Sequence, residues 1–130
     1  MKAVSGKDEK GNPRHGAFKD HFKNGQVSCE GNFDNGKKVG EWKYYLANGN
    51  LKAIGHYEDD QIVGDWQWYR ENGELSQTGA FTSDGEKHGI WKRYHTNGQL
   101  LDEGEFNKGK KTGLWTSYNN DGEVTKTKTY

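Results

Sequence analysis

One phrase occurs five times in this chain. It consists of Gly, an aromatic residue two positions later, Tyr at the fifth position in four copies, Asn-Gly or Asp-Gly at the eighth and ninth, and Leu or Val at the eleventh. The copies begin at Gly16, Gly40, Gly64, Gly89 and Gly113, so they are 24 or 25 residues apart. A fixed period of this length predicts one small supersecondary unit that is stacked several times, and stacked units present an extended surface.

Asn-Gly between apolar residues is the strongest short signal for a β-hairpin. We therefore expect an all-β fold without significant helix, an elongated antiparallel meander of about five stacked hairpins. The expected repeats span residues 16–39, 40–63, 64–88, 89–112 and 113–130. Residues 1–15 are expected to form an N-terminal arm or cap that adds one strand near Ala3 and Val4. The third linker holds the extra residue, which predicts a bulge or a longer turn there.

A two-residue turn at Asn48-Gly49 would place Leu46 opposite Leu51 and Trp42 opposite Gly55. The same count places every large motif ring over a glycine across its own hairpin, where the ring would cover bare backbone. One face of the sheet would then carry these rings together with the Leu or Val of each phrase. The predicted core consists of Phe18, Trp42, Trp66, Trp91 and Trp115 with Gly31, Gly55, Gly79 and Gly104.

Aromatic residues and glycine supply this core, because only 29% of the chain is hydrophobic. Such a low fraction would otherwise be typical of a disordered chain. Five Trp, seven Tyr and five Phe offer large areas for burial, and 19 Gly allow rings and backbones to approach closely. The sequence therefore predicts a folded domain.

The formal net charge is zero, with acidic second and third repeats between mildly basic ends. No continuous positive stripe follows from this pattern, so we do not expect nucleic acid or a membrane as the partner. No apolar run follows Met1, and we expect a cytoplasmic location, although a leader that had been removed would leave the same sequence. The single Cys29 marks no redox compartment.

Catalytic and metal-binding patterns are missing from the sequence. Five His are scattered without Cys or carboxylates at the spacing of metal ligands, and Cys29 and His21 fall on opposite faces of their predicted hairpin. We therefore expect no catalytic residues, no metal site, no cofactor and no enzymatic activity.

The phrase Gly-x-Trp-x-x-Tyr-x-x-Asn-Gly-x-Leu, followed by Gly-x-Phe or Gly-x-Tyr, resembles the MORN repeat and more closely its bacterial variant class. The resemblance covers residues 16–130 and implies stacked hairpins in an elongated, groove-like sheet. It also implies a non-enzymatic binding module, because some members are linked to membranes, others act as scaffolds, and many bacterial variants are labelled antitoxins.

Two groups of residues are candidates for contact with a partner. The first combines the tyrosine row with aromatic residues that recur in only two repeats, and the second is an acidic turn. The candidates are Tyr44, Tyr45, Trp68, Tyr69, Arg70, Tyr94 and Tyr118, with Asp59 and Asp60 in the acidic turn.

The leading hypothesis is a module that binds another protein, as an antitoxin or immunity protein would. Two alternatives stay open, a carbohydrate or cell-wall binding module and a membrane-associated scaffold. We expect a monomer or a weak end-to-end dimer, because both edge strands would be open.

Overall fold

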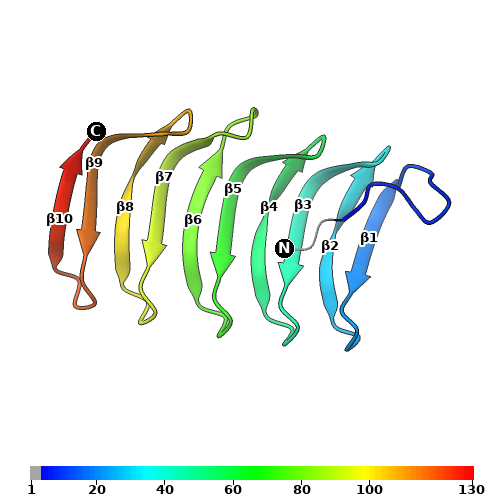
Figure 1. Ribbon diagram of the computed structural model, residues 1–130, viewed down its shortest axis with the longest axis horizontal. Coiled ribbons are helices and arrows are strands. Elements are labelled where there is room, and N and C mark those ends of the chain that lie inside the picture. Colours follow the sequence, from blue (N-terminus) through cyan, green and yellow to red (C-terminus); the bar gives the residue numbers. More distant parts are fainter. Residues whose placement is uncertain (1–3) are drawn as a thin grey trace.

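The computed structural model describes residues 4–130, which form one sheet of ten antiparallel strands in chain order (Figure 1). The strands are β1 (Gly16–His21), β2 (Val27–Asp34), β3 (Lys37–Tyr45), β4 (Leu51–Glu58), β5 (Gln61–Tyr69), β6 (Leu75–Phe81), β7 (Lys87–Tyr94), β8 (Leu100–Asn107), β9 (Lys110–Tyr118) and β10 (Val124–Thr129). The expected meander of five hairpins is confirmed. No helix occurs in the described residues, and hence none there could span a bilayer.

The turns that contain Asn-Gly or Asp-Gly lie along one rim of the sheet, and the linkers between repeats lie along the other, here called the linker rim. The Asn-Gly turns differ from the expected two-residue loops. In the second repeat the amide of Leu46 donates to the carbonyl of Asn50 (2.8 Å), and the amide of Gly49 donates to the carbonyl of Leu46 (2.9 Å). Among the loop residues only Gly49 has positive φ, at 89°, and Asn48 does not. The loop therefore holds three residues, 47–49. The side-chain oxygen of Asn48 stabilises this loop by accepting the amide of Asn50 (2.9 Å).

A bulge beside each of these turns restores the expected register. Tyr45 pairs with Leu51, so Leu51 shares the face of Tyr45, and the prediction that it lies with the tryptophans is wrong. Lys52 is the extra residue of the bulge, after which Trp42 pairs with Gly55 as expected. The same Tyr-to-Leu or Tyr-to-Val pairing recurs in β5–β6, β7–β8 and β9–β10.

Two-residue turns occur at the opposite rim, in three of the linkers between repeats. Both residues have positive φ in Asn35-Gly36 (49° and 86°), in Asp59-Asp60 (47° and 71°) and in Lys108-Gly109 (50° and 86°). The third linker contains a longer loop, in which the amide of Gly85 donates to the carbonyl of Thr82 (2.9 Å). The expected insertion is thus accommodated by a longer turn.

The leading glycine of each phrase is the position at which the strand bends. Gly40 has φ of 70°, a conformation that other residues rarely adopt. Beside it the pairing of β2 with β3 jumps from Asn32–Val39 to Glu30–Lys43. This bulge lets β3 leave the linker rim and turn down the sheet, and Figure 1 shows the same bend in the strand after each linker.

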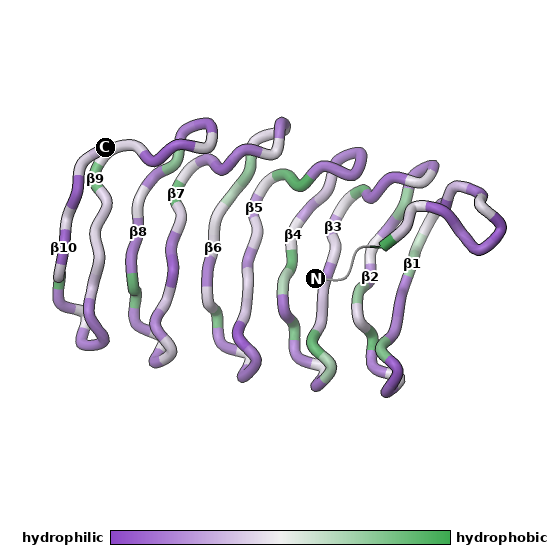
Figure 2. The backbone as a smooth tube through the Cα atoms, viewed as in Figure 1, coloured by the Kyte–Doolittle hydropathy of each residue, from purple (hydrophilic) through white to green (hydrophobic). Residues whose placement is uncertain are grey.

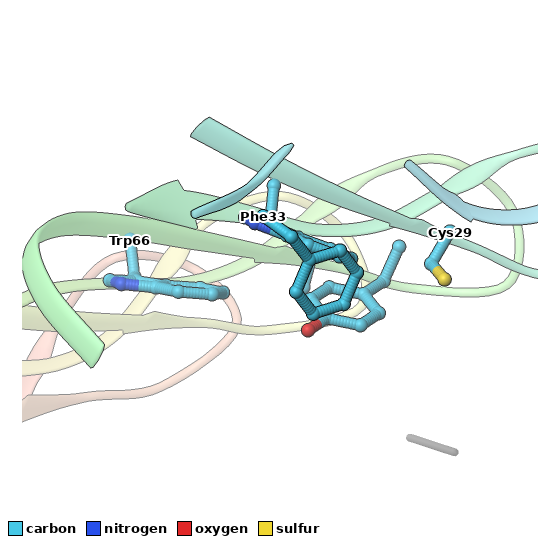
Figure 3. Close-up of a cluster of buried hydrophobic side chains, with 6 residues drawn as sticks. Cys29, Phe33 and Trp66 are labelled. Carbon is cyan, nitrogen blue, oxygen red and sulfur yellow. The ribbon is translucent and has the colours of Figure 1, made fainter. Parts of the chain in front are cut away.

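The tryptophan that follows each leading glycine by two positions covers a glycine of the preceding repeat. A Cβ added at Gly55 would lie 1.9 Å from Cδ2 of Trp66, and Gly31, Gly79 and Gly104 are covered in the same way by Trp42, Trp91 and Trp115. The prediction that each ring covers the glycine across its own hairpin is therefore wrong, although that glycine is its backbone partner. The indole of Trp66 donates to the carbonyl of His56 (3.2 Å) in the earlier repeat and lies close to the sheet (Figure 3).

The tryptophan stack is also the hydrophobic core. Trp42 and Trp66 are 0% and 1% exposed, and Phe33 and Trp91 are buried as well. Edge-to-face contacts join one repeat to the next, as between Phe33 and Trp42 with ring centroids 5.1 Å apart. Figure 2 shows few strongly hydrophobic positions, because the Trp and Tyr residues that make up much of this core score as nearly neutral or mildly hydrophilic on a hydropathy scale.

The described part of the N-terminal arm packs against the first repeat. The carbonyl of Arg14 accepts the amide of Gly36 (2.7 Å), and Val4 packs on the core cluster. Arg14 therefore occupies the place that Lys38 and Lys87 take in later repeats, whose carbonyls accept the amides of Asp60 (3.0 Å) and Gly109 (2.8 Å). Ala3 lies outside the described residues, and Val4 is not in a strand, so the expected additional strand there is not found at Val4.

Candidate functional site

The face that carries the tryptophans, here called the aromatic face, varies at one position in each repeat. This position lies two residues after the motif aromatic ring. Its five occupants are Asp20, Tyr44, Trp68, Arg93 and Ser117. The variation divides the aromatic face into a closed part and an open part.

Tyr44 and Trp68 close the aromatic face over the middle repeats. Tyr44 is 4% exposed, stacks on Trp42 and shares a hydrogen bond between hydroxyl groups with Tyr57 (2.9 Å). Burial raises the pKa of Tyr44 well above its ordinary value. Tyr44 was predicted to contact a partner, but its side chain is buried and belongs to the core of the sheet.

Trp68 forms a bridge between two repeats. Its ring stacks on Trp66, with centroids 6.0 Å apart, and on Trp91 of the next repeat, at 5.6 Å. The side chain stays half-buried, and the outer face of Trp91 is covered so that Trp91 is only 4% exposed. The surplus aromatic residue thus completes the packing of the third repeat.

Arg93 replaces this bridge in the fourth repeat, and a hollow opens beside it. Arg93 pairs across the hairpin with Asp102, to which its guanidinium donates two hydrogen bonds. This contact raises the pKa of Arg93 above its ordinary value. The hollow holds about 360 Å³, and Trp115 on its wall is only half-buried. It is lined by Gln77, Lys87, Trp91, Arg93, Asp102, Phe106, Lys111 and Trp115.

A row of cations follows the aromatic face along the linker rim. Lys87 places its ammonium 4.9 Å from the ring centroid of Trp91, and Lys111 places its own 4.6 Å from that of Trp115. Arg14 and Lys38 make the same contact in the first two repeats, whereas Ile62 interrupts the row in the third. This row was not predicted, although the sequence carries a usable signal for it, a basic residue two positions before the leading glycine in four of the five copies.

The predicted tyrosine row lies on the opposite face, with most of its hydroxyl groups already bonded within the sheet. Tyr45 donates to Glu30 (2.8 Å), Tyr69 to Gln67 (2.6 Å) and Tyr118 to Glu103 (2.7 Å). Burial and the Glu30 carboxylate raise the pKa of Tyr45 to about 12. Tyr94 is half-buried like the others. These tyrosines pair with Leu or Val across their hairpins, and the three bonded hydroxyl groups leave little polar capacity for a partner.

The remaining predicted contact residues lie apart from the hollow. Asp59 and Asp60 form the linker turn after β4, and Asp60 ties this turn to the preceding repeat by accepting the amide of Lys38 (2.7 Å). Arg70 is half-buried at the other rim, where its guanidinium donates to the carbonyl of Tyr94 in the next repeat. Asp60 and Arg70 therefore join neighbouring repeats, whereas Asp59 is exposed at the linker turn.

A second pocket, of about 200 Å³, lies beside Cys29 and Tyr44 at the N-terminal end of the array. The thiol of Cys29 is buried, and burial raises its pKa, so the thiolate is disfavoured there. Within residues 4–130 no group of three or more His, Cys, Asp or Glu side chains could hold a metal ion.

A comparison with protein families supports the repeat architecture. A family model described as the MORN repeat variant matches residues 14–35, 38–59, 62–82 and 87–108, together more than half of the chain. A comparison with curated proteins finds no match. Among solved structures, the chain is similar to one titled "Crystal structure of GtfA/B complex bound to UDP and GlcNAc", at 13% identity and a TM-score of 0.40. That alignment covers 68% of this chain and 22% of the other.

Proposed function

Because this chain belongs to the MORN repeat variant family, we propose that it is a non-enzymatic binding module whose partner is another protein. The observation that supports this proposal best is the interruption of the aromatic stack at Arg93. Where Trp68 bridges two repeats the face is closed, and where Arg93 stands a hollow exposes part of Trp115.

The hollow has the character of a recognition surface for protein. A partly exposed tryptophan beside an arginine is the pair of residue types most enriched at the energetic centres of protein interfaces. The wall residue Arg93 has a side chain that is 58% exposed, and two hydrogen bonds to Asp102 restrain its guanidinium before a partner arrives.

The double variant Arg93→Trp/Asp102→Gln tests this surface, because it copies the Trp68–Gln77 cross-strand pair of the third repeat. Its new ring should stack between Trp91 and Trp115 and fill the hollow without loss of stability. We expect wild-type protein used as bait in lysate of the source cell to retain a partner that the double variant does not retain.

Lys92→Trp is the matched control, since it adds the same bulk to the opposite face of the same strand. It should capture the partner as the wild type does. Equal capture by the wild type and by the double variant would exclude the hollow as the binding surface. Retention of glycans without any protein would instead favour carbohydrate binding, for which the half-buried Trp115 is the favourable observation.

An antitoxin or immunity role is a narrower form of the same proposal. It requires that the captured protein be harmful to the cell when it is expressed alone. Co-expression of this chain should then restore growth, and co-expression of Arg93→Trp/Asp102→Gln should not. Growth that is restored equally by both proteins would separate any protective effect from the hollow.

A further inference from the structure

Two ammonium groups lie at the edge of the hollow without an acidic partner. Lys87 is held against Trp91 and Phe106, with its Nζ atom 4.9 Å and 5.1 Å from the two ring centroids. Lys111 is held against Trp115 at 4.6 Å. Within residues 4–130 neither has a carboxylate at ion-pair distance, since the ion pairs there involve other residues. Two fixed and uncompensated positive charges therefore face whatever occupies this hollow.

The spacing of these lysines is set by the repeat. They stand at the same position of adjacent repeats, 24 residues apart, and one repeat contributes two strands to the sheet. Two strand spacings amount to roughly 9 to 10 Å along the array. A ligand that satisfies both lysines needs anionic groups at about that separation on one side.

A polyproline II segment has this separation between residues three positions apart. It has about 3 residues per turn and a rise of about 3.1 Å, so residues i and i+3 share one side at roughly 9.3 Å. In an extended strand residues i and i+3 point to opposite sides. Polyproline II segments also dock in grooves lined by aromatic rings, as Trp91, Phe106 and Trp115 line this one.

We infer that the hollow binds an acidic, proline-containing peptide segment in the polyproline II conformation, an inference that rests on the proposed protein-binding function. Carboxylates three residues apart contact Lys87 and Lys111, and the proline rings between them pack against Trp115. The segment runs along the array, across the strands, because the two lysines are aligned in that direction. Glutamate is favoured over aspartate, since its longer side chain reaches the rim from a backbone seated on the rings.

Fluorescence anisotropy with synthetic peptides tests the register directly. The probe is fluorescein-labelled Glu-Pro-Pro-Glu-Pro-Pro-Glu at low salt, and its isomer Pro-Pro-Glu-Glu-Glu-Pro-Pro has the same composition and charge. We expect the probe to bind about fivefold or more tightly than the isomer, because only the probe reaches both lysines at once. Equal affinities would refute the spacing argument, and this comparison requires no variant of the protein.

Variants of the two lysines then locate the site. Lys87→Met/Lys111→Met keeps the aliphatic stems on the rings and should weaken binding of the probe about tenfold. Lys92→Met/Lys110→Met removes the same charge elsewhere, and with this comparison made at about 0.15 M salt, where the Debye length is about 8 Å, it should leave the affinity within about twofold. An equal loss in both variants would reduce the effect to net charge and overturn the inference.

The outcome separates this inference from the proposed function. If Arg93→Trp/Asp102→Gln abolishes capture of the partner while the wild type does not bind the probe, the hollow binds protein and the ligand class inferred here is wrong. If hexaglucuronate binds more tightly than the probe, an acidic polysaccharide and not a peptide is the ligand. Binding of the probe with the expected dependence on register and lysines would support both statements.

Discussion

Gly55→Ala is the sharpest test of how the repeats are joined. The added Cβ would lie 1.9 Å from Cδ2 and 2.0 Å from Cε2 of Trp66. Ordinary contact begins near 3.4 Å, so the indole must withdraw by about 1.5 Å. It cannot move freely, because Trp66 is 1% exposed and its Nε1 donates to two backbone carbonyls, those of His56 and Val63.

The expected cost follows from two opposing effects. Overpacking of this kind costs up to about 3 kcal/mol. Alanine is better than glycine in a strand by roughly 0.5 to 1 kcal/mol, which offsets part of that cost. We therefore expect Gly55→Ala to lower the free energy of unfolding by about 2 kcal/mol, measured by urea titration with tryptophan fluorescence and far-UV circular dichroism.

Lys128 provides the matched control, because it pairs with Trp115 in the way that Gly55 pairs with Trp42. Residues 116–130 contain no tryptophan that could lie over Lys128. At this position Lys128→Ala should be more stable than Lys128→Gly by roughly 0.5 to 1 kcal/mol, the reverse of the order at Gly55. If glycine were better at both positions, each ring would cover the glycine across its own hairpin, and the reasoning would be refuted.

Three further predictions concern the rims and the bends. Asn48→Ala removes the bond to the amide two residues on (2.9 Å) and the bond to the carbonyl of Glu71 (3.1 Å), so a loss of about 1 to 2 kcal/mol is expected in urea titration. Gly40→Ala meets no steric contact but must adopt φ of 70°, and calorimetry should show a loss of about 1 to 2 kcal/mol from backbone strain alone. The pKa of Tyr45 is raised to about 12, so the contribution of its protonated hydroxyl group to stability is complete below pH 10 and should be lost between pH 10 and 12. Absorbance at 295 nm would follow this titration of Tyr45, and Glu30→Gln should shift the titration to lower pH.

Much of the fold follows from the sequence because glycine and asparagine have few alternatives at a turn. The pairing of Trp42 with Gly55 could be predicted even though the turn type was wrong. The third loop residue and the bulge at Lys52 each change the register by one, and the two changes cancel. Asn48 can stabilise either turn type, through its own positive φ or through its side-chain oxygen, so the dipeptide alone does not decide between them.

The site was harder to predict because it depends on the absence of a side chain. Tyr44 and Trp68 attracted attention as surplus aromatics, yet packing against Trp42, Trp66 and Trp91 uses them in the core. A sequence pattern shows which residue is present and does not show which space its neighbours leave empty. The hollow beside Arg93 could therefore be identified only in the structure, where Arg93 interrupts the stack of aromatic rings.

The longer loop of the third linker is a position at which the chain could be cut into two fragments that reassemble. Its Gly85 amide bonds within its own turn, so a cut after Ser83 would break no hydrogen bond between neighbouring linkers. One fragment would end with β6 as its edge strand and leave Gly79 uncovered, and the other would keep Trp91, which covers Gly79 in the intact array. Two such fragments carry complementary halves of one interface. Fused to two other proteins, they would reassemble when those proteins meet, and the burial of Trp91 would report the encounter as a change in fluorescence.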